Sequence, residues 1–143
     1  MKRLLTILFL FTLTSLSAQS NRIVGVWLTA DKSAKIEIVQ REKNFVGTMI
    51  WLETDRDEQG KPLTDTQNQD PSKRSRLLRG LEIIPNLVYK EGKWKGTIYD
   101  PESGKTYSCE IVLVNETTLE ISGYIGLPMF GRTEKWTRPK HQE

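Results

Sequence analysis

Apolar and polar residues alternate with a period of two through most of the chain from residue 23 onward. Ile36 and Ile38 alternate with charged neighbours in residues 34–39, and residues 106–114 show the same alternation. A period of two predicts β-strands with one buried face, and no window in this part of the chain has the period of a helix. The pattern therefore predicts an all-β protein.

Turn-forming residues separate the predicted strands, and the strongest turn signal lies at residues 100–104. Pro101 fixes one φ angle, Gly104 can adopt a positive φ, and Asp100 can accept a hydrogen bond from the backbone two residues on. We predict a β-hairpin at this turn, and we expect Pro85 to mark a bend or bulge at an edge. The predicted strands span residues 23–28, 34–39, 45–52, 80–84, 86–89, 93–99, 106–114, 118–124 and 132–137.

Eight or nine short antiparallel strands in chain order favour a closed barrel, because closure leaves no strand edge exposed. The fold class predicted here is a single small up-and-down β-barrel with one long polar loop. That loop covers residues 53–73, where Leu63 is the only strongly apolar residue. Loops of this length are often functional or disordered, so two interpretations stay open: a functional loop, and a mobile surface loop with a helical turn near residues 71–76.

The N-terminus has the layout of a cleaved secretory signal. Lys2 and Arg3 precede an apolar run at residues 4–13, and small residues follow up to Ala18. A membrane span needs about 20 apolar residues, which is roughly twice the length of this run. We predict that residues 1–19 are a signal peptide, with cleavage close to Ala18, and that residues 20–143 form the domain. The protein is then expected to be exported to the periplasm or the exterior and not to span the membrane.

Charge and reactive residues exclude several classes of function. The chain has 21 basic and 18 acidic residues, and removal of Lys2 and Arg3 with the signal leaves it nearly neutral, so we expect no nucleic-acid partner. The only histidine, His141, lies in a polar tail, and the only cysteine, Cys109, lies on the predicted inward face of a strand. We therefore expect no catalytic residue, no metal site and no cofactor.

Several motifs of the chain resemble two related groups of proteins. Gly25-Val26-Trp27 at the start and Trp136-Thr137-Arg138 at the end resemble the first and last strands of lipocalins and other calycin barrels. A match along nearly the whole domain identifies the chain as similar to the secreted bacterial domain of unknown function 2147. The segments that carry this match are Gly25-Val26-Trp27-Leu28-Thr29, Asn68 with Asp70-Pro71, Arg74-Ser75-Arg76 to Gly80, residues 98–107, and Gly131-Arg132-Thr133 with Trp136-Thr137-Arg138.

The resemblance implies a lipocalin-like barrel and an envelope location, and it implies a basic residue packed over the first tryptophan. It also singles out two arginines in a cationic run beside the long loop, which could bind an anionic group or could pair with nearby aspartates on a solvated face. The residues expected to shape the fold are Gly25, Trp27, Asp100, Pro101, Gly104, Trp136 and Arg138.

Aromatic and charged residues provide the candidate binding site. Aromatic linings bind apolar ligands inside barrels, but the interior of an eight-stranded barrel is also just wide enough for side chains to fill it. Whether Trp51 and Trp94 belong to a cavity or to the core stays open, while Arg132 and Glu134 share the parity of Trp136 and are expected to point inward as a structural pair. The candidate ligand-binding residues are Trp51, Trp94, Tyr107, Arg74, Arg76, Arg132 and Glu134.

The sequence therefore predicts an exported, non-enzymatic barrel that binds a small apolar or amphipathic molecule in the bacterial envelope. An alternative is an interaction or structural module that holds an envelope protein through its outer surface and the 53–80 loop. A hydrolase-type enzyme is the third possibility, because sequence alone does not show whether two carboxylates lie close enough for catalysis.

Overall fold

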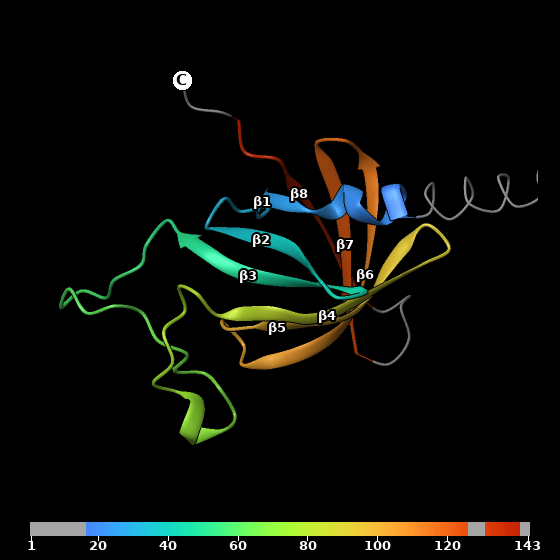
Figure 1. The fold of residues 1–143 in the computed structure, drawn as a ribbon. Helices are drawn as coiled ribbons and strands as arrows, with labels where there is room; N and C mark the ends of the chain where they lie inside the picture. The colour runs from blue at the N-terminus through green and yellow to red at the C-terminus, as the bar shows by residue number, and fades with distance from the viewer. Residues whose placement is uncertain (1–16, 126–130, 141–143) are drawn as a thin grey trace, which may run out of the picture.

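Eight antiparallel strands follow one another in chain order around a closed barrel (Figure 1). The computed structural model describes residues 17–125 and 131–140, and the predicted signal segment lies mostly outside them. The prediction of an all-β, up-and-down barrel is confirmed. The strands are β1 (Gly25–Leu28), β2 (Ala34–Arg41), β3 (Asn44–Leu52), β4 (Glu82–Lys90), β5 (Lys93–Asp100), β6 (Lys105–Asn115), β7 (Thr118–Tyr124) and β8 (Arg132–Thr137).

The two strands predicted on either side of Pro85 form one strand, β4. The register between β3 and β4 shifts from the pair Phe45–Leu87 to the pair Gly47–Ile84, so β4 has an extra residue there. Proline cannot donate a backbone hydrogen bond, and a bulge tolerates it within a sheet. The bulge was expected at an edge, but β4 pairs with β3 on one side and β5 on the other.

The up-and-down order places successive connections alternately at the two ends of the barrel. We call one end the closed end; it carries the short connections 42–43, 91–92 and 116–117. We call the other the open end; it carries residues 29–33, 101–104 and the long loop 53–81, which contains the short 3₁₀-helix η2 (Pro71–Lys73). The long loop, drawn in green, extends away from the barrel on the side opposite the N-terminal segment (Figure 1).

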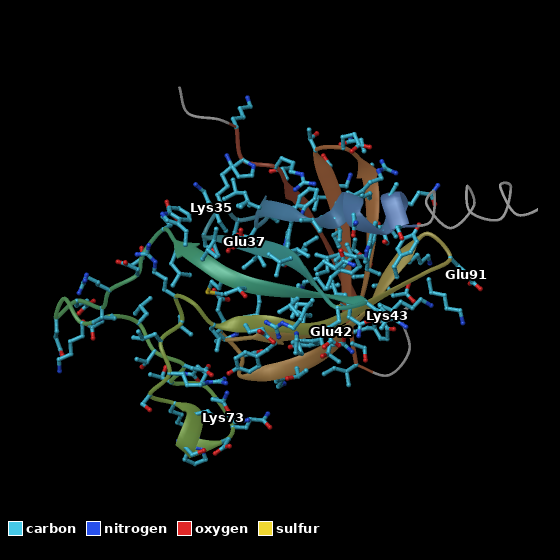
Figure 2. The ribbon with its side chains drawn as sticks, in the orientation of Figure 1. Lys35, Glu37, Glu42, Lys43, Lys73 and Glu91 are labelled. Carbon is cyan, nitrogen blue, oxygen red and sulfur yellow. The ribbon has the colours of Figure 1, made fainter. Side chains whose placement is uncertain are left out.

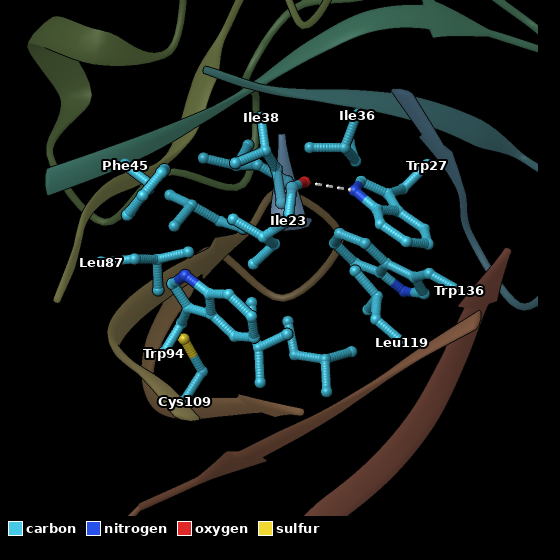
Figure 3. Packing of buried hydrophobic residues seen from close by; sticks show 14 of the residues in the cluster. Ile23, Trp27, Ile36, Ile38, Phe45, Leu87, Trp94, Cys109, Leu119 and Trp136 are labelled. Carbon is cyan, nitrogen blue, oxygen red and sulfur yellow. Dashed lines mark hydrogen bonds between the residues drawn. The ribbon is translucent and has the colours of Figure 1, made fainter. Parts of the chain in front are cut away.

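Two tryptophans bind the N-terminal segment at the closed end. This segment includes the 3₁₀-helix η1 (Asn21–Ile23). The indole N–H of Trp27 donates to the Ile23 carbonyl at 2.8 Å, and that of Trp94 donates to the Ser20 carbonyl at 3.1 Å. Ile23 is fully buried among the indoles and the aliphatic residues around them (Figure 3). The segment therefore plugs this end of the barrel.

Arg138 reinforces the junction between the first and last strands. β1 and β8 pair only at Leu28 and Thr137. The Arg138 guanidinium lies 3.8 Å from the centre of the Trp27 ring and donates to the carbonyls of Val24 and Arg22, each at 2.9 Å. These contacts join the residue after β8 to β1 and to the segment before it, where the backbone pairing of the two strands is short.

Gly25 gives Arg138 the space that it needs. It has a φ of 127°, which L side chains rarely adopt, and a β-carbon there would clash with Nη1 of Arg138. The outer face of the barrel is polar by contrast, and charged residues of β2 such as Lys35 and Glu37 project from it (Figure 2).

We predict that Arg138→Ala lowers the free energy of unfolding by about 2–4 kcal/mol, because it removes a cation–π contact and leaves backbone carbonyls without donors. Urea unfolding followed by tryptophan fluorescence measures the change. Arg41→Ala is the matched control, since Arg41 forms an exposed ion pair with Glu82 and its loss is expected to cost less than about 1 kcal/mol. Equal effects of the two substitutions would contradict the assigned role of Arg138.

Candidate functional site

The open half of the barrel contains a cavity of about 840 Å³. Inward-facing positions near the closed end carry large residues such as Phe45 and Trp94, whereas positions in the open half include Ala34 and Gly123. The difference in side-chain size leaves space at one end only. Apolar residues of the cavity wall are Ala34, Ile36, Met49, Leu52, Leu63, Leu78, Ile83, Ile98, Ile121 and Trp136.

Trp136 is 3% exposed and lies where the cavity meets the packed core. Its indole N–H finds no acceptor within residues 17–125 and 131–140, unlike those of Trp27 and Trp94. Packing therefore holds Trp136 in place, next to Trp27 in the core (Figure 3).

Polar residues surround the mouth of the cavity. Five carboxylates and one guanidinium belong to its lining, and all except the half-buried Asp100 are exposed, so the cavity opens to solvent. They come from the β1–β2 connection, the end of β3, the β5–β6 turn and β8. These residues are Asp31, Glu53, Asp100, Glu102, Glu134 and Arg132.

Three of the predicted ligand-binding residues lie in the cavity wall: Tyr107, Arg132 and Glu134. Arg132 and Glu134 were expected to form an ion pair, but the described part of the chain shows none between them. Both side chains are exposed at the mouth, where water can solvate each charge separately. Their charges are therefore available to a ligand.

Trp51 does not line the cavity, because a bulge in β3 reverses its orientation. Ile36 pairs with Met49 and Lys35 pairs with Trp51, so Ile50 is an extra residue between them. A strict alternation from Met49 would point Trp51 inward, but the extra residue turns it outward. The ammonium of Lys35 lies 4.9 Å from the centre of its ring on the outer face.

Trp94 and Cys109 belong to the closed half. Trp94 is buried, and its ring centroid lies 4.8 Å from that of Tyr89. Burial raises the pKa of the Cys109 thiol to about 12, so at neutral pH it stays protonated and is a poor nucleophile. Both residues act as core residues here.

The two arginines singled out by the resemblance organise the long loop. The Nε of Arg74 donates to the Asn68 carbonyl at 2.8 Å, and Arg76 forms a 2.7 Å ion pair with Asp65. Neither belongs to the lining of the 840 Å³ cavity. They therefore do not offer a binding site at its mouth.

Asp65 is the centre of this network and is fully buried. Its carboxylate accepts hydrogen bonds from Tyr99 at 2.5 Å, Arg76 at 2.7 Å and Asn68 at 2.8 Å. Burial alone would raise the pKa of Asp65, but these hydrogen bonds and the charge of Arg76 outweigh it, so the pKa lies below its ordinary value. Burial and the adjacent Asp65 carboxylate raise the pKa of Tyr99 to about 12.

The network fixes the long loop against the barrel. Gly104, which has a φ of 70°, lies against the Gln67 carbonyl so closely that a β-carbon would overlap it. Leu63 and Leu78, on either side of the Asp65 network in sequence, contribute to the cavity wall. These contacts hold the loop against the barrel and make Leu63 and Leu78 part of the mouth.

A second cleft of about 730 Å³ lies outside the barrel, between the long loop and strands β4 to β6. Its lining is mostly polar and includes Lys73, Arg76, Glu82 and Lys105. Three of these charges already have partners, since Glu82 pairs with Arg41, Arg76 pairs with Asp65 and Lys73 pairs with Asp70. We assign the candidate site to the internal cavity because its floor is apolar and enclosed by the barrel.

The described ranges also bear on two other features, a metal site and a membrane-spanning helix. Within residues 17–125 and 131–140, no three His, Cys, Asp or Glu side chains are grouped as a metal ion would require. In the same ranges, no helix combines the length and apolarity needed to cross a bilayer.

Comparison with known proteins agrees with this geometry. The fold is a closed eight-stranded barrel of the lipocalin type. Residues 25–138 match a family of uncharacterized proteins conserved in bacteria, DUF2147, and the chain belongs to this family. The resemblance inferred from the sequence is thereby confirmed.

A solved structure gives the same architecture. The protein HP1028 from the human pathogen Helicobacter pylori, described as a member of the lipocalin family, is 24% identical to this chain. The match covers 83% of this chain and 84% of that one with a TM-score of 0.70, and at this identity it shows the fold alone. No curated protein matches the chain.

Sequence reasoning missed the carboxylates at the mouth other than Glu134, and it did not identify Asp65 as the centre of the loop. Asp31 and Glu102 lie in turns, and their meeting at one end follows from the alternation of connections in an up-and-down barrel. The alternation of connections could therefore have predicted that these two carboxylates lie at the same end of the barrel. Asp65 and Tyr99 are 34 positions apart in the sequence, so no local pattern predicts their contact.

We predict that Asp65→Asn loosens the long loop while the barrel stays folded. The substitution removes charge-assisted hydrogen bonds, and we expect it to lower the local stability of residues 53–80 by about 1–3 kcal/mol. Amide hydrogen exchange measures this change. Glu58→Gln, an exposed carboxylate of the same loop, is the control and is expected to leave exchange unchanged.

Acid should have the same effect on the wild-type loop. Because the pKa of Asp65 is lowered in the folded state, its contribution is fully present above the ordinary value of about 3.9 and is lost as the pH falls through the lower folded value. Exchange in residues 53–80 that is equally fast in wild type and Asp65→Asn at neutral pH would contradict this assignment.

Proposed function

We propose that this protein is exported and binds a small apolar or amphipathic molecule in the bacterial envelope. The internal cavity is the single observation that carries the proposal. Its volume of about 840 Å³ lies within the range of about 300–1,000 Å³ found for small-molecule sites. The ligand inserts its apolar part between Ile36, Ile83 and Ile121 and keeps its polar part at the mouth.

The hydrophobic effect provides the affinity. Each methylene that moves from water to an apolar site contributes about 0.8 kcal/mol before the costs of association are subtracted. The cavity floor is buried and preformed, so little of this free energy is lost to ordering the protein. The lipocalin-like fold agrees with such a role.

Export is supported by the signal pattern in the sequence and by the position of the first packed residues. Ser20 and Ile23 supply the carbonyls that bind Trp94 and Trp27. Both residues lie just after the predicted cleavage position. Cleavage there would leave the plug of the closed end intact.

The alternative of an interaction module receives less support. Arg74 and Arg76 were its candidate contact residues, and both are engaged within the long loop. Their hydrogen bonds to Asn68 and Asp65 would have to break or be shared for a partner to bind. The enzymatic alternative depends on two carboxylates placed for catalysis, and we favour binding because the cavity floor is apolar.

We predict that the mature chain binds a neutral fluorescent apolar probe such as N-phenylnaphthylamine in a one-to-one complex. Ile98→Trp fills part of the cavity and is expected to weaken binding at least about tenfold, because the probe loses the space that it would occupy. Isothermal titration calorimetry measures the affinity without interference from the added indole.

Val112→Trp is the matched control for the cavity variant. It introduces the same indole on the outer face of β6, where Val112 is exposed opposite Glu120 of β7, so binding should not change. If the probe does not bind, or if both variants weaken binding equally, the cavity is not the binding site. Capture of an envelope protein through the long loop would then favour the interaction module.

We also predict that the exported protein begins at Gln19 or Ser20. Mass spectrometry of the protein purified from an envelope fraction identifies its first residue. Ala18→Arg, which changes the residue beside the predicted cleavage site, should block processing and leave the longer form. An intact residue 1 on protein recovered from the cytoplasmic fraction would contradict the export proposal.

A further inference from the structure

We propose that the ligand is an amphipathic cation, in which an amine or quaternary ammonium group is joined to an apolar body. This inference rests on the proposed function and concerns the polar part of the same ligand. It is drawn from the charges that surround the mouth of the internal cavity.

Negative charge dominates the mouth. The cavity lining contains five carboxylates but only one cationic side chain, Arg132. The domain without its predicted signal is nearly neutral, so this excess is local to the cavity. A cleft lined by charges of one sign focuses the field and raises the local concentration of ions of the opposite sign.

Three of the carboxylates are free to meet a ligand. Glu53, Glu102 and Glu134 are exposed, and none forms an ion pair with another described residue. They come from the end of β3, the β5–β6 turn and β8, which lie at different positions around the barrel. A cationic group at the mouth would therefore have carboxylates on several sides.

The other two carboxylates accept hydrogen bonds from residues of the adjacent turns. Asp31 accepts hydrogen bonds from the backbone N–H and hydroxyl of Ser33 and from the hydroxyl of Thr29. The bonds from Ser33 contribute most to a lowered pKa of Asp31, so it is ionised at neutral pH. Asp100 similarly accepts from the N–H of Glu102 and the hydroxyl of Ser103.

Aromatic residues lie in the same wall. Tyr107 and Tyr124 are half-buried and belong to the cavity lining together with Glu134. The faces of aromatic rings attract cations, and quaternary ammonium groups are often recognised in this way. The faces of these rings do not attract an anionic head, and the surrounding carboxylates would repel it.

The two arginines that could have favoured an anionic head do not offset the negative charge of the mouth. Arg74 and Arg76 were candidates for binding such a head, but both lie in the long loop outside the cavity lining. Arg132 is then the one cation of the lining among the described residues, and it lies two positions from Glu134 on the same strand. Like-charge repulsion thus selects against carboxylates and phosphates.

The test compares three ligands with the same apolar chain, each below its critical micelle concentration. Decyltrimethylammonium, decanol and decanoate are titrated into the domain at pH 7 and low ionic strength, and their Kd values are measured by calorimetry. We expect the cation to bind about tenfold or more tightly than decanoate, with decanol between them. Raising the salt concentration to 1 M should reduce the difference, because salt screens exposed charges.

Variants locate the source of this preference. The triple variant Glu53→Gln/Glu102→Gln/Glu134→Gln should remove most of the difference between cation and anion and leave decanol binding unchanged. Arg132→Gln should strengthen binding of the cation by about twofold to fivefold.

A second triple variant is the control for net charge. Glu37→Gln/Glu42→Gln/Glu91→Gln changes the charge by the same amount at exposed positions outside the cavity lining (Figure 2). It should keep the preference of the wild type.

The outcomes separate this inference from the proposed function. Equal binding of all three ligands, or tighter binding of decanoate, overturns the cationic assignment and leaves binding in the cavity intact. A preference that the two triple variants alter equally also overturns it, because the effect then comes from net charge. Failure of all three ligands to bind overturns the proposed function and this inference with it.

Discussion

The packing of Trp27 and Trp94 on the N-terminal segment determines how the inside of this barrel is used. The interior of an eight-stranded barrel can be filled completely by side chains, so a cavity forms only where large residues are concentrated elsewhere. Here both indoles bind carbonyls of residues 20–23 and close one end. Arg138 covers Trp27 from outside and joins the last strand to the first. The opposite half is thereby left open above an apolar floor.

The long loop contributes to the open end in a different way. Its backbone is held by the buried carboxylate of Asp65, which accepts hydrogen bonds from the loop itself and from Tyr99 of β5. A buried charge needs such hydrogen-bond partners. Here the hydrogen bonds to Asp65 also fix where Leu63 and Leu78 lie. A mainly polar segment can thus supply apolar wall residues to the cavity. Under the function proposed here, the acidic mouth sets the charge of the ligand that enters the apolar interior.

The sequence predicted the barrel well because its strands have a period of two and its turns have clear signals. The same reasoning placed Arg132 and Glu134 on the inward side by their parity with Trp136. It did not place Trp51, because the extra residue Ile50 in a bulge changes the parity and nothing in the local sequence marks it. The acidic mouth was missed for another reason, since its carboxylates come from separate connections and meet only in three dimensions.

Methyl NMR of the domain during titration with decyltrimethylammonium tests the central claim most directly. With labelled isoleucine and methionine methyl groups, the account predicts chemical-shift changes and ligand contacts in the open half. The methyl groups expected to respond belong to Ile36, Met49, Ile83, Ile98 and Ile121. Ile23, Ile38 and Ile111, which are buried in the core outside the cavity lining, are expected to respond least. Contacts confined to the outer face, or the largest changes around Ile23, would contradict the account.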